Sequence, residues 1–93
     1  MFVTIGIHRP YPEKEGALID SMHRYGEAMT GNRGLVRVHT LKCERSGALV
    51  GMAIWDTKED WEAARPAMQD AIREDPFDEW EPVEPEVYWL GEV

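Results

Sequence analysis

The chain has 93 residues, which fits a single domain covering residues 1–93, and it carries a formal net charge of −8 at pH 7. Its 10 Lys and Arg form no cluster among 18 Asp and Glu, so we expect no nucleic-acid partner, because a grip on phosphates needs clustered cations. The single cysteine, Cys43, cannot form a disulfide within the chain, no segment resembles a signal peptide, and no apolar run reaches the ~20 residues of a membrane span. We therefore expect a cytoplasmic protein without membrane contact.

The N-terminal third predicts a strand followed by a helix. Residues 2–8 are mostly β-branched or aromatic, and Pro10 and Pro12 stop strand pairing after them. A helix is expected from about Pro12 to Thr30, ended by a Gly-Asn pair. Its apolar stripe, which would dock on a sheet, consists of Leu18, Met22, Tyr25 and Met29.

The middle of the chain predicts a β-hairpin. Residues 35–43 and 48–55 are two strand-like runs, and the turn between them contains Gly47, which can adopt a positive φ. The two strands should therefore pair antiparallel.

A second helix follows this hairpin almost without a loop. Thr57 is a suitable N-cap, with carboxylates in the first helical turn after it. Pro66 removes the hydrogen bond to the Glu62 carbonyl, so we expect the helix to kink or split there and to end near Glu74. Its apolar stripe consists of Trp61, Ala64, Met68 and Ile72.

The last part of the chain predicts a loop and a final strand. Residues 75–85 are acidic and interrupted by prolines, so we expect a loop held in place by Phe77 and Trp80. The carboxylates from Glu74 to Glu86 are expected to form a solvated surface. Residues 86–93 predict the fourth strand.

The element order predicts the fold class. It is β-α-β-β-α-β, which corresponds to a ferredoxin-like α+β fold with a four-stranded antiparallel sheet and two helices on one face. Two helices cover only one face, yet the strands are apolar at both alternating phases, as in residues 49–55. We therefore expect a homodimer that covers the open sheet face.

Residues 54–63, Ile-Trp-Asp-Thr-Lys-Glu-Asp-Trp-Glu-Ala, resemble the passage from the third strand to the second helix in the antibiotic biosynthesis monooxygenase (ABM) domain family. The element order, the chain length and the Gly34-Leu35 start of the second strand resemble that family too. The resemblance implies a dimeric α+β barrel, in which two sheets pack face to face and each subunit keeps a pocket between its own sheet and helices.

The resemblance also implies two kinds of reaction. Some members of the family oxidise polycyclic aromatic substrates with dioxygen and no cofactor, because the substrate carbanion supplies the electron; here this implies a small phenol- or quinol-type substrate. Others open haem with an Asn in strand one and a Trp and a His near helix two. Ile5 stands at the best-matching strand position and residues 58–75 contain no His, so haem degradation is disfavoured. Haem binding without cleavage stays open.

Two of the three histidines are candidates for chemistry. His8 and His39 lie in expected strands, and either one could act as a neutral base near pH 7. The alternative is a histidine that only forms a hydrogen bond, since the sequence shows no orienting partner for either. His23 is expected off the apolar face of the first helix, and the spacing of the three predicts no metal site.

If the pocket lies where the resemblance implies, six residues are expected to line it: Ile5, Met22, Tyr25, Trp61, Met68 and Ile72. The alternative is that these side chains only pack in the core. The alternative function is a non-catalytic domain that binds a small ligand or has a structural role. The strand positions expected to face the helices favour it, because Val3, Ile5 and Ile7 carry no polar group.

Overall fold

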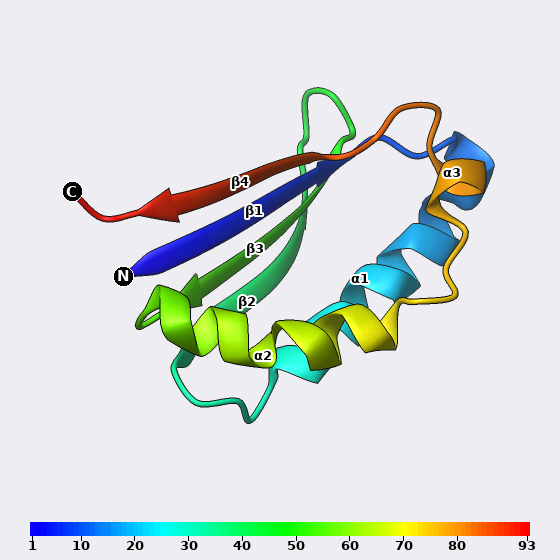
Figure 1. Ribbon diagram of the computed structural model, residues 1–93. Coiled ribbons are helices and arrows are strands. Elements are labelled where there is room, and N and C mark those ends of the chain that lie inside the picture. Colours follow the sequence, from blue (N-terminus) through cyan, green and yellow to red (C-terminus); the bar gives the residue numbers. More distant parts are fainter.

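The computed structural model describes residues 1–93 and contains one four-stranded antiparallel sheet in the order β2-β3-β1-β4. The two long helices lie on the same side of this sheet (Figure 1). This is the predicted ferredoxin-like α+β fold, which is confirmed. The elements are β1 (Phe2–His8), a 3₁₀ turn (Pro12–Lys14), α1 (Glu15–Met29), β2 (Leu35–Lys42), β3 (Leu49–Trp55), α2 (Lys58–Ala71), α3 (Phe77–Trp80) and β4 (Glu86–Gly91).

The second long helix differs from its prediction. α2 begins at the expected cap, where the Asp60 N–H donates to Thr57 Oγ1 over 3.1 Å. It then continues through Pro66 as one helix and ends at Ala71, so the split, one of the two outcomes predicted there, is wrong. Pro66 and Glu62 are both exposed, so water can bind the carbonyl that the proline leaves without a partner. None of the helices combines the length and apolar character needed to cross a bilayer.

The two faces of β1 are the reverse of those predicted. Phe2 faces the helices, since its ring lies 5.1 Å from the Trp61 ring of α2. Thr4 pairs with Trp89 of β4, whose ring lies 5.3 Å from Trp61 on the same side. Alternation along the strand then directs the side chains of Val3, Ile5 and Ile7 to the face without helices. The prediction failed because the apolar phase of β1, which carries Val3, Ile5 and Ile7, lies on the uncovered face and not under the helices.

The core lies where β1 begins and β3 ends. Phe2 pairs with Trp55 across these strands, and α2 covers them. The largest side chain of the core, Trp55, is completely buried. The cluster consists of Phe2, Met29, Ala53, Trp55, Trp61, Ala64 and Met68.

The acidic segment before β4 also differs from its prediction. It contains the single helical turn α3, in which Phe77 and Trp80 pack edge to face with ring centroids 5.5 Å apart. The Tyr11 N–H donates to the Trp80 carbonyl over 2.9 Å and so holds α3 beside the end of β1. Glu81, expected in solvent, is 4% exposed. The segment is therefore packed against the fold at this carboxylate.

The other face of the sheet has no helix on it. Its central side chains are half-buried and apolar, and they come from β1 and β3: Val3, Ile5, Ile7, Val50, Met52 and Ile54. Leu41 of β2 and Leu90 of β4 extend this surface and are each about half exposed, at 46% and 45%. A continuous apolar face of this kind is unusual for a monomer.

Candidate functional site

A cavity of about 380 Å³ lies between the sheet and helices α1 and α2. It exists because the row of residues across the middle of the sheet is small on this side. Gly6 pairs with Gly51, while Thr40 and Val87 continue the row on either flank. No large side chain from β1 or β3 therefore fills the space below the helices, and the two glycines form part of the cavity floor.

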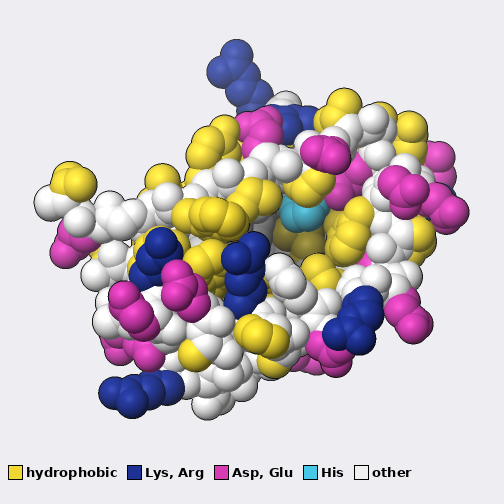
Figure 2. Space-filling view, in the orientation of Figure 1, with side chains coloured by type: hydrophobic (Ala, Val, Ile, Leu, Met, Phe, Trp, Pro, Cys, Tyr) yellow, Lys and Arg dark blue, Asp and Glu magenta, His cyan; other side chains and the backbone are white.

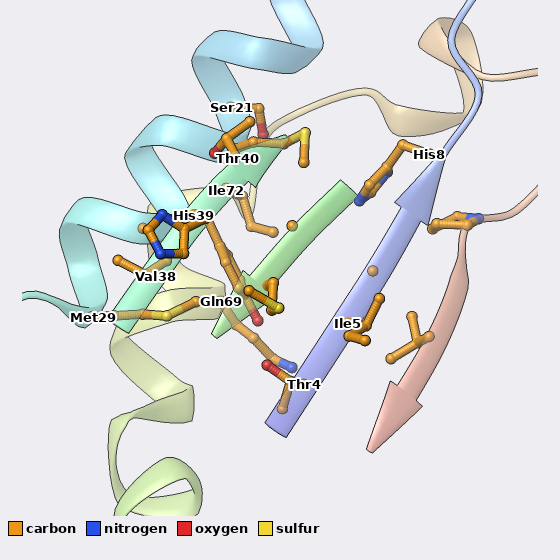
Figure 3. Close-up of a pocket in the computed structure, with 18 of the residues that line it drawn as sticks. Thr4, Ile5, His8, Ser21, Met29, Val38, His39, Thr40, Gln69 and Ile72 are labelled. Atoms are coloured by element: carbon orange, nitrogen blue, oxygen red, sulfur yellow. The ribbon is translucent and has the colours of Figure 1, made fainter. Parts of the chain in front are cut away.

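The cavity opens on the surface as a hollow lined by apolar side chains, with a histidine inside it (Figure 2). Half of its 22 lining residues are hydrophobic. Figure 3 shows that they come from both sheet and helices, with Thr4 on β1, Val38 and Thr40 on β2, and Gln69 on α2. This composition suits an apolar ligand fixed by a few polar contacts.

Four of the six pocket residues predicted from the sequence line this cavity with helical side chains: Met22, Tyr25, Trp61 and Ile72. Ile5 also borders it, but β1 alternation points the Ile5 side chain to the uncovered face. Met68 does not line it, because this side chain is completely buried in the core.

His8 is the one of the three histidines that has an orienting partner. Its Nδ1 lies 2.9 Å from Oε2 of the buried Glu81, and the other oxygen of this carboxylate accepts the Arg9 backbone N–H over 3.0 Å. Beside an ionised carboxylate, which only accepts hydrogen bonds, a neutral His8 imidazole donates from Nδ1 and carries its free lone pair on Nε2. In this tautomer Nε2 is the nitrogen that can accept a proton.

The His8 ring leans from the end of β1 towards the middle of the cavity (Figure 3). A Cβ at Gly6 would lie 3.5 Å from His8 Nε2, so this nitrogen lies above the glycine floor. The Phe77 ring of α3 packs beside His8, with centroids 6.5 Å apart. His8 is thus held by a carboxylate on one side and an aromatic ring on the other, with its free nitrogen over the floor.

Glu81 was missed in the sequence because it lies in a run of carboxylates that resembles a solvated surface. Its neighbours Trp80 and Pro82, both apolar, were the only local signal that distinguishes it. The chain after α3 returns to the end of β1 and brings Glu81 next to His8, although the two residues are 73 positions apart in the sequence.

The other two histidines lack such a partner. His39 is exposed on the edge strand β2 and borders the cavity, and His23 is exposed on α1. Neither forms a hydrogen bond or an ion pair within the chain. No three His, Cys, Asp or Glu side chains come together in an arrangement that could hold a metal ion.

An aromatic and cationic group lies at another part of the wall. The Arg65 guanidinium carbon lies 5.0 Å from the Trp61 ring centroid and 5.2 Å from that of Trp89, and all three residues line the cavity. Tyr25 also lines the wall, and burial raises its pKa, although the Arg65 cation partly opposes this effect. The Tyr25 hydroxyl therefore keeps its proton near neutral pH and can donate a hydrogen bond.

A polar contact fixes the segment that carries Glu81. The buried Ser21 of α1 donates from Oγ to Asp75 Oδ2 over 2.6 Å, and Arg24 Nη2 donates to Asp75 Oδ1 over 3.2 Å. These bonds join α1 to the residues just before α3. They occupy the Ser21 hydroxyl, so this lining group is less free to bind a ligand.

Comparison with solved structures gives the same architecture. Rv0793 from Mycobacterium tuberculosis is similar with a TM-score of 0.83 and 15% identity, over 99% of this chain and 94% of that one. A candidate antibiotic biosynthesis monooxygenase from Nitrosomonas europaea is similar with a TM-score of 0.77 and 17% identity, over 100% and 99% of the two chains. A further antibiotic biosynthesis monooxygenase has a TM-score of 0.78 at 10% identity, over 100% and 99%.

This chain has the fold of the antibiotic biosynthesis monooxygenase proteins. The resemblance seen in residues 54–63 is thereby confirmed at the level of the fold. No protein-family model and no curated protein matches the sequence. Identities between 10% and 17% leave the reaction and its substrate to be argued from the site.

Proposed function

We propose that this chain is an ABM-type monooxygenase that oxidises a small phenol- or quinol-type aromatic substrate with dioxygen and without a cofactor. The His8–Glu81 pair is the observation that carries the proposal. It supplies a general base with a defined tautomer at the wall of a cavity suited to an aromatic ligand.

In the proposed reaction, the phenol-type substrate reacts as its keto (anthrone-type) tautomer, and His8 Nε2 removes a proton from the ring CH₂ group of that tautomer. The resulting carbanion donates electrons to dioxygen and forms a carbon–oxygen bond. One oxygen atom stays in the product as a carbonyl, and the other leaves as water with the two hydrogens removed from the carbon. The substrate therefore supplies every electron that reduces dioxygen.

The rest of the cavity supports formation of this anion. Apolar walls reduce the competition of water for polar contacts, and the Tyr25 hydroxyl is a donor that can hydrogen-bond a developing oxyanion. Glu81 accepts the hydrogen bond from His8 Nδ1 and so stabilises the imidazolium that forms when His8 takes the proton. In this proposal His8 transfers the proton and Glu81 orients the His8 ring.

Oxygen consumption tests the proposal directly. Protein treated with a chelator and freed of flavin is mixed with a panel of quinols and anthrones, and dioxygen uptake is measured with an electrode. We expect turnover with part of the panel. His8→Asn should lower it by about 10²- to 10⁴-fold, because the amide still donates to Glu81 but no side-chain base remains.

His23→Ala is the matched control, because this exposed histidine of α1 has no place in the proposed chemistry. Equal turnover of His8→Asn and the parent protein would contradict the assignment of the base. The alternative is a non-catalytic binding domain, and binding of the same compounds without any oxygen uptake would establish it. Titration with haemin separates haem binding, since an unshifted Soret band would exclude it.

We also propose that a second copy of this chain packs on the uncovered face of the sheet. Six half-buried apolar side chains of β1 and β3 lie there, with Leu41 and Leu90 beside them. Burial of ~800 Å² per subunit, more than half of it apolar, is worth roughly 10 kcal/mol for each subunit before association costs. Repulsion between two acidic subunits is screened within about 8 Å at physiological salt.

A polar cluster at the end of this face would form part of the rim of such an interface. Glu86 accepts from Arg9 Nη1 over 2.6 Å and from the Tyr88 hydroxyl over 2.7 Å. The Tyr88 and Arg9 hydrogen bonds lower the pKa of Glu86, so this carboxylate stays ionised near neutral pH. An apolar centre with a polar rim is the usual composition of a dimer interface.

A further inference from the structure

Arg65 is the cation of the cavity wall, and the reaction proposed above assigns it no particular partner. It lies on α2 one turn after Trp61, with its guanidinium over the Trp61 and Trp89 rings. We infer that the ligand of this cavity is an aromatic acid whose carboxylate pairs with Arg65. This inference rests on the proposed function, because it specifies the substrate class of the same cavity.

Arg65 has no anionic partner within the chain. The protein contains 18 Asp and Glu, and all seven of its ion pairs use other basic residues. Lys14, Arg37 and Arg45 are also unpaired, but none of them lines the cavity. In so acidic a protein, a cavity-lining arginine without a carboxylate is a site left free for an external anion.

The guanidinium group of Arg65 lies over two indole rings, with its carbon 5.0 Å and 5.2 Å from the ring centroids. An arginine that stacks on aromatic rings keeps the N–H donors at its edge available. A carboxylate accepts two parallel N–H bonds from such an edge. Arg65 is also half-buried, which strengthens the pairing because water screens it less.

Arg65 and His8 lie at different places along the cavity. Trp89, beneath the guanidinium, pairs with Thr4, and His8 lies four residues further along β1. Four residues of a strand span ~13 Å, so the cation and the base lie at separate parts of one apolar cavity. A flat ring system can bridge them, with its carboxylate at Arg65 and its reacting carbon near His8 Nε2.

A simpler role for Arg65 is to stack on the two tryptophans and stabilise α2. A binding experiment distinguishes this role from carboxylate binding. The affinities of 2-naphthoate and its neutral isostere 2-naphthamide are measured by isothermal titration calorimetry at low salt. We expect the acid to bind the parent protein at least ~10-fold more tightly than the amide. Arg65→Gln should abolish this preference and leave the amide affinity within about threefold.

Two further variants make the result specific. Arg73→Gln removes the same charge from an exposed arginine that is paired with Asp70 and does not line the cavity, so it should keep the preference for the acid. Arg65→Lys keeps the charge without the planar fork and should restore part of the preference. Thermal unfolding of each variant confirms that the protein tested is folded.

Equal affinity for acid and amide, no measurable binding of the acid, or a preference that survives in Arg65→Gln would each overturn the inference. Oxygen uptake is measured separately. A preference for the acid without turnover of any quinol would support the inference and contradict the proposed oxygenation. Turnover of neutral quinols without a preference for the acid would support the oxygenation and contradict the inference.

Discussion

The two faces of β1 belong to the same seven residues but differ in kind. Towards the helices the side chains vary in size and polarity: Phe2, Thr4, Gly6 and His8. Towards the uncovered face they are uniformly β-branched and apolar: Val3, Ile5 and Ile7. On the helix side, successive residues of β1 contribute to the core, to the cavity floor and to the cavity wall, so their side chains differ. The proposed dimer interface needs only a continuous apolar surface. The variation at one phase therefore marks the functional face.

The largest effect is expected from a change to the carboxylate that orients His8. In Glu81→Gln the amide oxygen accepts from the Arg9 N–H, and the amide NH₂ then faces His8 Nδ1. This arrangement puts the imidazole proton on Nε2 and removes the base. We expect the turnover number for dioxygen uptake to fall by about 10²- to 10⁴-fold.

Glu79→Gln, which removes an exposed carboxylate from the same helical turn, should leave the rate unchanged. A nitrogen-15 NMR measurement of the His8 ring gives the tautomer independently of any activity. An unchanged tautomer in Glu81→Gln would show that the carboxylate does not orient the base.

The next largest effect is expected on the uncovered face. Ile5→Asp places a carboxylate in the centre of the proposed interface, among the apolar side chains of β1 and β3, and should raise the dissociation constant of the dimer by at least ~100-fold. Ile5→Val keeps the surface apolar and should not change the dissociation constant measurably. In sedimentation equilibrium we expect the parent to have twice the chain mass of 10.7 kDa and Ile5→Asp to have the single mass. A parent protein that sediments at the single mass would contradict the dimer.

The smallest effect is expected from a methyl group added to the cavity floor. In Gly6→Ala the added Cβ lies 3.5 Å from His8 Nε2, an ordinary contact, so the fold tolerates it. Because glycine is unfavourable in a strand, the free energy of unfolding should rise by up to ~1 kcal/mol. The methyl group takes space below the ring, so KM should rise by up to about tenfold.

Gly16→Ala is the matched substitution on exposed α1, where an added Cβ has no neighbour within 4 Å. It should stabilise the protein by a similar amount, ~1 kcal/mol, without a change in KM. A KM shift of equal size in both variants would show that the Gly6 effect does not arise from the cavity floor.

Most element boundaries were predictable because they depend on neighbours in the sequence. The strand from Phe2 to His8 was predicted with the observed bounds, and Thr57 caps α2 as expected. α3 was missed, because one helical turn is too short to show a helical period. The split at Pro66 was predicted from a missing hydrogen bond, but one such bond at an exposed position does not outweigh the packing of the rest of the helix.

The candidate site was only partly predictable for a related reason. Met22, Tyr25, Trp61 and Ile72 were found because a helix has one apolar face, and that face must meet the sheet. Ile5 was assigned to the wrong side because the apolar phase of β1 can pack on helices or lie on an uncovered sheet face, and the sequence does not distinguish the two. His8 was a candidate by residue type alone, and nothing near it in the sequence predicted a partner.

The sequence by itself determined the order and type of the elements, the apolar faces of the two helices and the excess of apolar strand surface, because these follow from local periodicity and composition. The tertiary structure decided which face of β1 turns to the helices, since this depends on how Phe2 and Thr4 meet Trp61 and Trp89. It also decided that Gly6 lies beside Gly51, which opens the cavity, and that Glu81 returns to His8. Contacts between residues so distant in the chain depend on its path through space, and no local pattern records that path.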